Sequence, residues 1–416
     1  MMKEKIAFVV VRYGKDINGG AEYHCRMLAE RLVDDYDVEV LTTGVKDYIK
    51  GGNDIADGVE FINGVRVRRF KVEPVSGASE WELQKKAKPV RRLRMFLYRI
   101  GLLRLLSYFV PVWKWQSGKE LEAMKRSVFY SPQLHRFIKE HKDFYKAFIP
   151  ITVDFVPFYY TAILAGEKSI AIPTMHYAKV SFKALLTDAF SRFAYVGFNT
   201  EAEQKLGEHI FGKALGKHGI ISVGIESVRP ADWKETKTKY SLPDKYLLYV
   251  GRIDKGKVND VIVYFSKYKR KYEDSVLKLV MVGGLFDEVA SAPDVLYTGF
   301  VSDGEKVSII QHADLVVNPS RYESLSLILL EALSLGKPML VNGRCAVLKE
   351  HCKLSNGAVD YYMNERQFVS KLHKIENSLG LKEQMSDLGK RYVAENYDWV
   401  LIMSRLKNAI ESIPSR

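Results

Sequence analysis

The sequence predicts an α/β protein with two doubly wound domains, each built on a mostly parallel sheet. Three observations support this fold class. Apolar runs of strand length alternate with stretches of helical periodicity throughout the 416 residues. The strand-like runs are continuously apolar, which is typical of parallel strands covered on both faces. A polar, charged stretch at residues 227–245 separates two such alternating sets, so we expect it to link two domains.

The first alternating set starts at the N-terminus. Its expected strands are residues 5–11, 37–43, 145–150, 168–176 and 193–199. A helix is expected at residues 20–34, and residues 59–70 are expected to form a hairpin because they contain an Asn-Gly turn. Thr200 and Glu203 have the spacing of a capping box, which predicts the start of another helix.

The second alternating set follows the linker. Its expected strands are residues 246–251, 276–284, 295–300, 313–320 and 337–342. Ser302 and Glu305 predict a second capping box. Residues 321–339 have an apolar helical pattern interrupted by Glu331, and we expect this helix to begin near Glu323.

The composition is that of a folded protein. Hydrophobic residues make up 47% of the chain, so each domain has enough of them for a core. The cysteines lack CxxC spacing and a full set of ligating neighbours, so neither a disulfide framework nor a metal site is expected. The first residues show no signal-peptide pattern, and no apolar run reaches the roughly 20 residues of a membrane-spanning helix. We therefore expect a cytoplasmic protein.

Positive charge is concentrated in one segment, residues 83–119, which we call the basic segment. The net charge of the chain is +13, and the basic segment has no acidic residue. Its cations are Lys85, Lys86, Lys88, Arg91, Arg92, Arg94, Arg99, Arg104, Lys114 and Lys119. Long apolar and aromatic side chains alternate with them, which indicates a surface that lies on anionic lipid. Packing on its own domain is the alternative, and nucleic acid is disfavoured because the aromatic residues lack regular stacking spacing.

Two loops that follow expected strands have residues suited to phosphate. In doubly wound sheets, ligands bind at the carboxyl ends of the strands, and with two domains we expect the site in the cleft between them. Gly19 and Gly20 precede a helix N-terminus, which attracts anions, although Gly-Gly pairs are also common turns. The pattern is not GxGxxG, so a nicotinamide site is not supported. Arg252 and Lys257 share one short loop and suit a diphosphate, although a solvated loop would have the same composition.

Glu323 and Glu331 stand eight residues apart. On one helix that spacing is roughly 12 Å and about 80° of rotation, which is too far for a paired-carboxylate acid–base site. The two could instead hold the ends of one extended ligand, with the N–H groups of Leu325, Ser326 and Leu327 between them aimed at an anion. A nucleoside diphosphate sugar is such a ligand. A structural ion pair of Glu331 with a buried Arg or Lys is the alternative.

At this point the motifs carry a family resemblance. The chain resembles the retaining glycosyltransferases of the GT-B fold, family four, through its E-x7-E pair and the runs "GRIDKGK", "NGGAE", "ADLVVNPSRYES" and "YDWVLIMSRLKNAI". The resemblance implies two Rossmann-like domains facing across a cleft. Residues 1–222 would bind the acceptor, with the basic segment as an excursion, and residues 223–395 would bind the donor. Residues 396–416 would form a helix that returns to the first domain.

The resemblance also implies roles for the donor-side residues. Glu331 would bond the ribose hydroxyls, and Glu323 would contact the transferred sugar or stabilise charge near its anomeric carbon. Arg252 and Lys257 would neutralise the diphosphate, and the backbone at Val301 would lie beside the base. The glycines that many family members have after the first glutamate are replaced here by serines in "ESLSL".

In the first domain, the resemblance implies that Gly19 and Gly20 allow the backbone to approach the phosphate and sugar. His176 would be the histidine beside the sugar, a catalytic candidate together with Glu323. Tyr177 follows it where an acid often stands. The last pair of glycines of the donor domain is replaced by Asn356-Gly357-Ala358.

The implied function is a metal-independent, retaining transfer of a sugar from a nucleoside diphosphate sugar, with UDP preferred over GDP and no cofactor. The expected acceptor is a saccharide, with a lipid-linked precursor of a bacterial-type surface polysaccharide as the favoured example. The expected location is the inner face of the cell membrane, bound peripherally through its anionic lipids. A catalytically inactive glycan-binding or membrane-adaptor subunit and a sugar-nucleotide epimerase are the alternatives.

Overall fold

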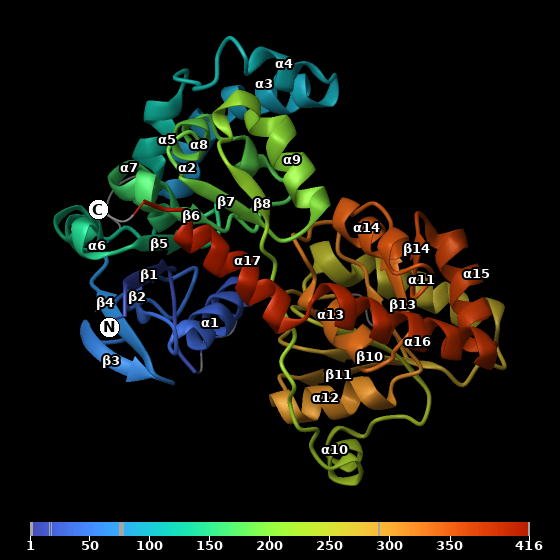
Figure 1. Cartoon of the computed structure of the whole chain (residues 1–416). Helices are drawn as coiled ribbons and strands as arrows, with labels where there is room; N and C mark the ends of the chain where they lie inside the picture. The colour runs from blue at the N-terminus through green and yellow to red at the C-terminus, as the bar shows by residue number, and fades with distance from the viewer. Residues whose placement is uncertain (1–2, 16, 18, 75–78, 290–291, 415–416) are drawn as a thin grey trace. The chain divides into compact units, whose positions relative to one another are not determined.

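A computed structural model of the protein describes residues 3–15, 17, 19–74, 79–289 and 292–414. The chain divides into two compact units, coloured along the chain in Figure 1. Unit 1 consists of Met1–Val223 together with Val400–Arg416, and unit 2 consists of Gly224–Trp399. The last segment of the chain is therefore part of the first unit. Each unit is an α/β structure with its own parallel sheet and core, which confirms the expected fold class.

Unit 1 has a five-stranded sheet of order β3-β4-β2-β1-β5 and a three-stranded sheet of order β6-β7-β8. Its strands are β1 (Lys5–Val9), β2 (Asp37–Thr43), β3 (Gly58–Ile62), β4 (Val65–Phe70), β5 (Ala147–Pro150), β6 (Ile170–Ala171), β7 (Tyr195–Phe198) and β8 (His218–Ile220). Parallel bridges from Phe148 to Ser169 and from Ile151 to Ile172 connect the two sheets. All pairs except β3–β4 are parallel, and the strand order reverses between β1 and β5. That reversal is the switch point at which doubly wound sheets bind ligands.

The helices of unit 1 pack against these strands (Figure 1). They are α1 (Gly20–Leu32), α2 (Glu80–Lys86), α3 (Lys88–Arg99), α4 (Leu102–Leu106), α5 (Ser117–Met124), α6 (Pro132–His141), α7 (Val156–Ala165), α8 (Leu185–Phe190), α9 (Glu201–Phe211) and α17 (Trp399–Glu411), with 3₁₀ turns η1 (Lys142–Phe144), η2 (Gly166–Lys168), η3 (Lys179–Phe182) and η4 (Gly212–Ala214). One core cluster of this unit is rich in aromatic residues, including Phe158, Phe190 and Phe211. The basic segment contributes most of α2, then α3 and α4 and the start of α5.

The hairpin expected at residues 59–70 is confirmed. β3 and β4 pair antiparallel and are joined by Asn63 and Gly64, whose φ angles of 50° and 82° are those of a type I′ turn. The strand expected at residues 168–176 is much shorter, because Pro173 has no N–H to donate and Thr174 has a φ of 45°. β8 has no counterpart among the expected strands, since its three residues include a glycine and a histidine.

The capping box expected at Thr200 is only half present. Thr200 Oγ1 accepts a hydrogen bond from the backbone N–H of Glu203 at 3.1 Å. The Glu203 carboxylate, in contrast, accepts bonds from the N–H groups of Met175 at 2.5 Å and Asn199 at 2.7 Å. The reciprocal half of the prediction is wrong because a loop distant in sequence takes the carboxylate. Glu203 therefore ties α9 to the segment after β6.

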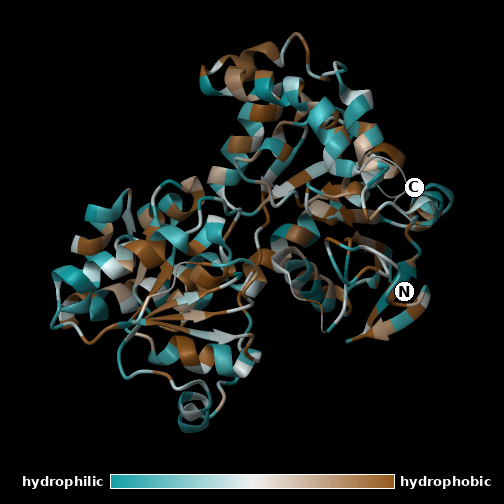
Figure 2. Ribbon diagram, turned by 180° about the vertical axis from the view of Figure 1, so that it is seen from behind, coloured by the Kyte–Doolittle hydropathy of each residue, from teal (hydrophilic) through white to brown (hydrophobic). Residues whose placement is uncertain are grey.

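Unit 2 has one six-stranded, fully parallel sheet of order β11-β10-β9-β12-β13-β14. Its strands are β9 (Tyr246–Val250), β10 (Lys278–Val282), β11 (Val295–Gly299), β12 (Leu315–Asn318), β13 (Met339–Asn342) and β14 (Val359–Tyr362). Renumbered along the unit, this is the order 3-2-1-4-5-6 of a dinucleotide-type fold, with its switch point between β9 and β12. Figure 2 shows the hydrophobic colouring of these strands. β14 was not among the expected strands.

The helices of unit 2 are α10 (Trp233–Tyr240), α11 (Lys255–Lys271), α12 (Asp303–His312), α13 (Leu327–Ser334), α14 (Ala346–Leu354), α15 (Glu365–Glu376) and α16 (Leu379–Asn396). The capping box of Ser302 and Glu305 at the start of α12 is confirmed. Residues 227–245 are not simply a linker, because they contain α10, which is capped by Asp232 and packs against α12. Among the residues that the structure describes, no helix is both long and apolar enough to cross a membrane.

Candidate functional site

The switch point of unit 2 brings together two residues that the sequence singles out. Lys257 lies in the first turn of α11, after β9, and Glu323 lies on the loop after β12. The Lys257 Nζ atom is 3.9 Å from Oε1 of Glu323. Both side chains keep part of their surface in solvent, with 30% and 20% exposed. A cation and a carboxylate thus lie together at the carboxyl ends of two neighbouring strands.

The expectation that Arg252 and Lys257 share one loop is wrong, because Arg252 lies on the loop after β9 and Lys257 lies in the first turn of α11, but the two share a partner, Asp254. Oδ1 of Asp254 caps α11 by accepting the N–H of Lys257 at 3.0 Å, and Oδ2 accepts the Arg252 Nε–H at 2.8 Å. The Arg252 side chain is 65% exposed, so its remaining N–H donors face solvent. Gly283 is required beside this loop, because a Cβ there would lie 2.1 Å from the carbonyl oxygen of Gly251. Arg252 and Lys257 therefore lie on a short segment, from the end of β9 into α11, whose backbone is fixed by close contacts.

The segment between the two glutamates differs from expectation. α13 begins at Leu327, not near Glu323, so the two carboxylates are not on one helix and the 12 Å spacing does not apply. The helix starts late because its N-cap residue, Ser326, has a left-handed backbone with φ 79°. This serine stands where the resembling family has a glycine, and it keeps a conformation that favours glycine. Asn318 Nδ2 donates to Ser326 Oγ at 2.9 Å and lies 3.5 Å from Glu323 Oε1.

The start of α13 leaves backbone N–H groups without partners inside the helix, as every helix N-terminus does. Leu325 and Ser326 are buried and Leu327 is half-buried. The loop before the helix is held by His351, whose Nε2 bonds the carbonyl oxygen of Leu325 at 2.8 Å. The hydroxyl of Tyr392 lies 2.8 Å from Nδ1 of the same ring. Burial lowers the pKa of His351 to about 4, so the ring is neutral and acts as a structural support. No sequence motif pointed to this histidine.

Glu331 lies on α13 and pairs with Lys306 of α12, whose Nζ is 3.0 Å from its Oε1. Burial raises the pKa of Glu331, and the charge of Lys306 opposes that rise. The structural partner considered for Glu331 is thus present, while its role toward a ribose stays a prediction. Val301 is half-buried and immediately precedes Ser302, the N-cap of α12. The expected base-binding and ribose-binding positions are therefore connected through α12.

The switch point of unit 1 holds a buried ion pair of Arg12 and Glu22, covered by the more exposed Tyr48, that no sequence motif indicated. Arg12, which follows β1, donates from Nε to Oε1 of Glu22 at 2.9 Å, and its guanidinium lies 3.6 Å from the ring centroid of Tyr48. The Tyr48 hydroxyl also bonds Glu22. Gly19 is the N-cap of α1, and a Cβ there would lie 2.1 Å from Oε2 of Glu22. Gly20 faces open space. The N-terminus of α1 is therefore occupied by a carboxylate of its own chain.

The ends of β5 and β6 carry the histidine that the resemblance points to. The His176 backbone oxygen accepts bonds from the N–H of Ala178 at 2.7 Å and from the hydroxyl of Ser181 at 2.8 Å. Asp154 follows β5 and interacts electrostatically with His176 and with the buried Lys183. Desolvation by surrounding protein atoms raises the pKa of Asp154, and the interactions with His176 and Lys183 oppose that rise. Asp154 is a second acidic candidate that no sequence motif indicated.

Glu203 fixes the backbone of the segment after β6 that carries His176. Its carboxylate accepts the N–H of Met175, the residue before His176. Burial raises the pKa of Glu203 to about 8, although the bonds from Asn199 and Met175 act in the opposite direction. The histidine is thus carried on a segment with several fixed contacts.

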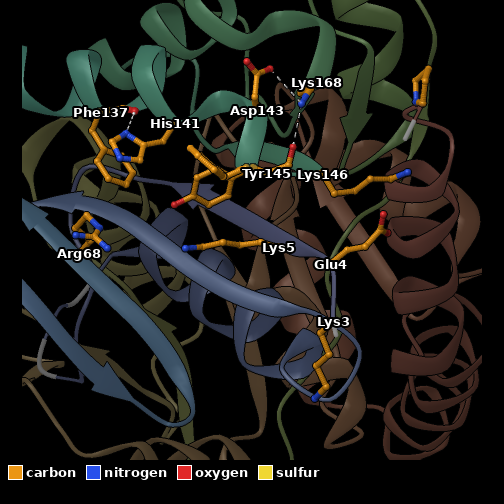
Figure 3. Close-up of a pocket in the computed structure, with 12 residues that line it drawn as sticks. Lys3, Glu4, Lys5, Arg68, Phe137, His141, Asp143, Tyr145, Lys146 and Lys168 are labelled. Carbon is orange, nitrogen blue, oxygen red and sulfur yellow. Dashed lines mark hydrogen bonds and ion pairs between the residues drawn. The ribbon is translucent and has the colours of Figure 1, made fainter. Parts of the chain in front are cut away.

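A cavity of about 900 Å³ lies at another place in unit 1 (Figure 3). It is lined by residues at the amino ends of the strands, such as Lys5 at the start of β1 and Lys146 just before β5. Three of its cations are paired with carboxylates: Lys5 and Arg68 lie 2.7 Å and 2.8 Å from Glu39, and Lys168 lies 3.7 Å from Asp143. This cavity is at the opposite edge of the sheet from the switch point, so we do not include it in the candidate site.

Among the residues that the structure describes, no cluster of three or more His, Cys, Asp or Glu side chains could hold a metal ion. All three cysteines are free. Each unit therefore has its own set of candidate residues at the carboxyl ends of its strands: on the loops after β9, β11 and β12 in unit 2, and on the loops after β1, β5 and β6 in unit 1.

Comparison with known proteins gives one family match and many structural relatives. Residues 233–392 match the family described as glycosyl transferases group 1. An uncharacterized glycosyltransferase of Methanocaldococcus jannaschii is 23% identical over 426 aligned positions, which cover 95% of each chain. The alpha-D-kanosaminyltransferase of Streptomyces kanamyceticus is 28% identical over 43% of this chain and 50% of its own length.

Two solved structures show the fold across the whole chain. HepE of Anabaena, in complex with UDP and glucose, superposes with a TM-score of 0.66 at 14% identity and covers 98% of this chain and 100% of its own. Sucrose-phosphate synthase of Thermosynechococcus elongatus gives a TM-score of 0.64 at 13% identity, with 98% of each chain covered. The fold is thus that of the GT-B glycosyltransferases. Residues 233–392 match glycosyl transferases group 1, and 95% of the chain aligns with a relative named as a glycosyltransferase.

Proposed function

We propose that the protein transfers a sugar from a nucleoside diphosphate sugar to a saccharide acceptor, with retention of the anomeric configuration and without a metal ion. The observation that carries this proposal is the convergence of Arg252, Lys257 and Glu323 at the switch point between β9 and β12. HepE, a structural relative, has been solved with UDP and glucose. UDP is therefore the preferred nucleotide in this proposal, with GDP as the alternative base.

On the donor side, Lys257 and the exposed Arg252 supply positive charge for the diphosphate. Arg252 has N–H donors left after its bond to Asp254, and a guanidinium fork fits two phosphate oxygens. The backbone N–H groups at Leu325, Ser326 and Leu327 would add to this at the start of α13.

As the sugar–phosphate bond breaks, negative charge grows on the leaving diphosphate. Fixed cations and N–H groups lower the barrier most when they lie where that charge develops. Glu323, held near Lys257 and Asn318, would stabilise positive charge at the sugar. Glu331 would bond the ribose in exchange for part of its contact with Lys306, and Val301 would contact the base.

On the acceptor side, His176 would lie beside the transferred sugar, and Gly19 and Gly20 would let the backbone of unit 1 approach it. The acceptor hydroxyl would attack the face from which the diphosphate leaves, and a phosphate oxygen would accept its proton. This scheme uses no covalent sugar–enzyme intermediate and no cofactor. Asp154 interacts electrostatically with His176, so it would help to orient that side chain.

We also propose that the acceptor is linked to lipid and that the basic segment rests on anionic membrane. Its exposed apolar side chains support this, among them Phe96 at 57%, Tyr108 at 60% and Phe109 at 79% exposure. Figure 2 shows apolar colouring in this part of unit 1. Not every residue of the segment takes part. Arg94 is fully buried and donates to the carbonyl oxygens of Phe182, Lys183 and Ile210. Leu103 belongs to a core cluster of unit 1, and the partly buried Leu97, Tyr98 and Trp113 pack against that cluster.

The nucleotide part of this proposal is tested by thermal shift with UDP, GDP, ADP and UDP-sugars. A ligand at 100 times its Kd raises stability by about 2.7 kcal/mol, and we expect uridine diphosphates to give the largest increase in Tm. If none of the nucleoside diphosphates changes the Tm, the donor assignment is wrong. Sugar transfer should also be unchanged by EDTA, and loss of activity with the chelator would contradict the metal-free scheme.

A further inference from the structure

A second cavity, of about 230 Å³, lies in unit 1 between α2, α3 and the start of η3. Its lining is Trp81, Gln84, Lys85, Lys88, Arg91, Arg92, Met95 and Lys179. Five of these residues are cations, and none of the lining residues that the structure describes has a carboxylate. We call it the α2–α3 cavity.

Most of these cations have no carboxylate partner. Arg91 is engaged, since its Nε lies 3.5 Å from Oε1 of the buried Glu120. Lys85, Lys88, Arg92 and Lys179 form no ion pair within the part of the chain that the structure describes. The nearest acid in sequence, Glu82, is used by the capping box of α2, where it accepts the Ser79 N–H at 2.8 Å. Four cations around one small cavity repel each other unless an anion lies among them.

Trp81 gives the cavity an aromatic wall. Its side chain is 66% exposed, which is unusual for a tryptophan without a ligand or partner. The Lys85 ammonium lies 3.2 Å from the centroid of its ring, so one cation is held at the rim. Indole presents a rigid surface with both apolar and polar contacts, which suits the remainder of a ligand whose anionic group is inside.

The cavity adjoins the candidate acceptor loop. Lys179 begins η3, three residues after His176. The His176 carbonyl oxygen accepts bonds from Ala178 and Ser181, which stand on either side of Lys179 in sequence. A group bound in the cavity would therefore be anchored to the same segment that carries the candidate catalytic histidine.

We propose that the α2–α3 cavity binds a phosphate or diphosphate group attached to the acceptor. The claim that the bound group belongs to an acceptor rests on the proposed glycosyl transfer, whereas the anion site itself does not depend on it. A phosphate monoester carries a charge of about −1.5 to −2 and three acceptor oxygens, which match several convergent ammonium and guanidinium groups. The volume suits a phosphate or diphosphate, because a water molecule occupies about 30 Å³, and excludes an oligosaccharide.

The anion site is tested by calorimetric titration with inorganic pyrophosphate. Because Arg252 and Lys257 could also bind pyrophosphate, the titrations use an Arg252→Ala/Lys257→Ala background. We expect the triple change Lys88→Ala/Arg92→Ala/Lys179→Ala to weaken binding at least about tenfold. The matched control Lys86→Ala/Lys114→Ala/Lys119→Ala removes three exposed cations of the basic segment that do not line the cavity. Equal loss in the two triple variants, or no binding before they are made, would overturn the proposal.

Two further arms identify the source of the phosphate. In one, a soluble sugar phosphate replaces pyrophosphate. In the other, neutral vesicles carry about 1% of a lipid diphosphate. If the triple variant of the lining residues, Lys88→Ala/Arg92→Ala/Lys179→Ala, loses about tenfold in affinity for the soluble ligand alone, the site is assigned to soluble phosphosugars. If it loses affinity in both arms, the site is assigned to phosphate groups in general. A loss with vesicles alone assigns it to a lipid-borne group. Identical binding of lining and control variants in both arms contradicts the site. Failure of UDP to shift the Tm would refute the donor assignment without affecting these titrations.

Discussion

The ammonium group of Lys257 and the carboxylate of Glu323 lie 3.9 Å apart although 66 residues separate them in sequence. They follow β9 and β12, which are neighbours in the sheet because the strand order reverses between them. Neither charge needs the other for burial, since both are partly exposed. An exposed ion pair of this length contributes only about 0–1 kcal/mol to stability, so its place at the switch point is better explained by a ligand than by the fold.

Removing the charges of Arg252 and Lys257, the residues proposed to bind the diphosphate, should abolish transfer and leave the fold intact. Arg252→Ala/Lys257→Ala removes two cations, and each charge-assisted hydrogen bond to phosphate is worth about 1.5–3 kcal/mol, which corresponds to about 10- to 100-fold in nucleotide affinity. Lys255→Ala is the matched control, because Lys255 is an exposed cation at the first position of α11, between Arg252 and Lys257 in sequence. Kd for UDP and Tm are measured together. If the double variant unfolds, the loop is structural.

Alanine substitutions of Glu331 and Glu323 should have different effects on nucleotide binding and turnover. Glu331→Ala should raise the Kd for nucleotide, because the ribose loses its acceptor, while Glu323→Ala should lower kcat more than nucleotide affinity. Glu331→Ala also leaves Lys306 without its partner. The double variant Glu331→Ala/Lys306→Ala removes that side effect, so it should recover Tm but not nucleotide binding. Recovery of both would reduce Glu331 to a structural ion pair.

Ser326 should tolerate glycine better than alanine. A left-handed conformation costs a non-glycine residue about 1–2 kcal/mol, and the bond from Asn318 contributes about 1 kcal/mol. Ser326→Gly loses the bond but relieves the backbone, so its stability should be near wild type. Ser326→Ala loses the bond and keeps the strain, so it should be about 1–2 kcal/mol less stable. Urea unfolding measures both. Equal destabilisation by the two changes would count against backbone strain at this position.

Glu203 predicts a pH dependence of stability. Its pKa is raised from 4.5 to about 8 in the folded protein, so the folded state holds a proton that the unfolded chain releases. This contribution is fully present below about pH 4.5 and is lost as pH rises toward about 8. In Glu203→Gln the side chain cannot ionise. The Tm of the wild type should therefore fall relative to that of Glu203→Gln between pH 5 and 8. Parallel Tm curves across this range would show that Glu203 does not titrate there.

Two neighbouring residues, Leu102 and Leu103, allow membrane binding to be tested separately from stability. Leu102 is 43% exposed and Leu103 is 1% exposed. Leu102→Asn together with Phe109→Asn should reduce co-sedimentation with anionic vesicles and leave Tm unchanged, whereas Leu103→Asn should lower Tm by disturbing the core of unit 1. Salt should release part of the bound protein, because charges are screened over about 8 Å at physiological ionic strength. Binding that is indifferent to lipid charge and salt would leave the basic segment as packing only.

Local sequence patterns predicted local structure well, and contacts between distant residues were not accessible to them. The Asn63-Gly64 hairpin and the Ser302–Glu305 capping box are confirmed because each depends on neighbouring residues alone. Glu203 followed the same pattern as Glu305 but bonds Met175, 28 residues away. Arg94 is indistinguishable in sequence from the exposed cations around it, yet carbonyl oxygens of a distant segment bury it.

The candidate site shows the same division. Strand alternation predicted which loops hold the donor-side residues, since those residues directly follow strands. The late start of α13 could not be predicted, because serine is a common N-cap and its left-handed φ depends on the bond from Asn318. His351 and Asp154 have no motif around them. They matter only through the groups that the fold places beside them, Leu325 and His176.

The assignment of Val400–Arg416 to unit 1 has a consequence for how the protein is made. The Tyr36 hydroxyl bonds Glu411 at 2.6 Å, and Lys407 lies 2.6 Å from Asp35, so α17 closes onto the α1–β2 connection. On the ribosome, the first 223 residues, which make up most of unit 1, emerge long before this helix exists. Unit 2 is contiguous and is complete while unit 1 still exposes the apolar face that Ile402, Leu406 and Ile410 will cover. During that interval the nascent chain offers a binding surface to chaperones that the finished protein does not have.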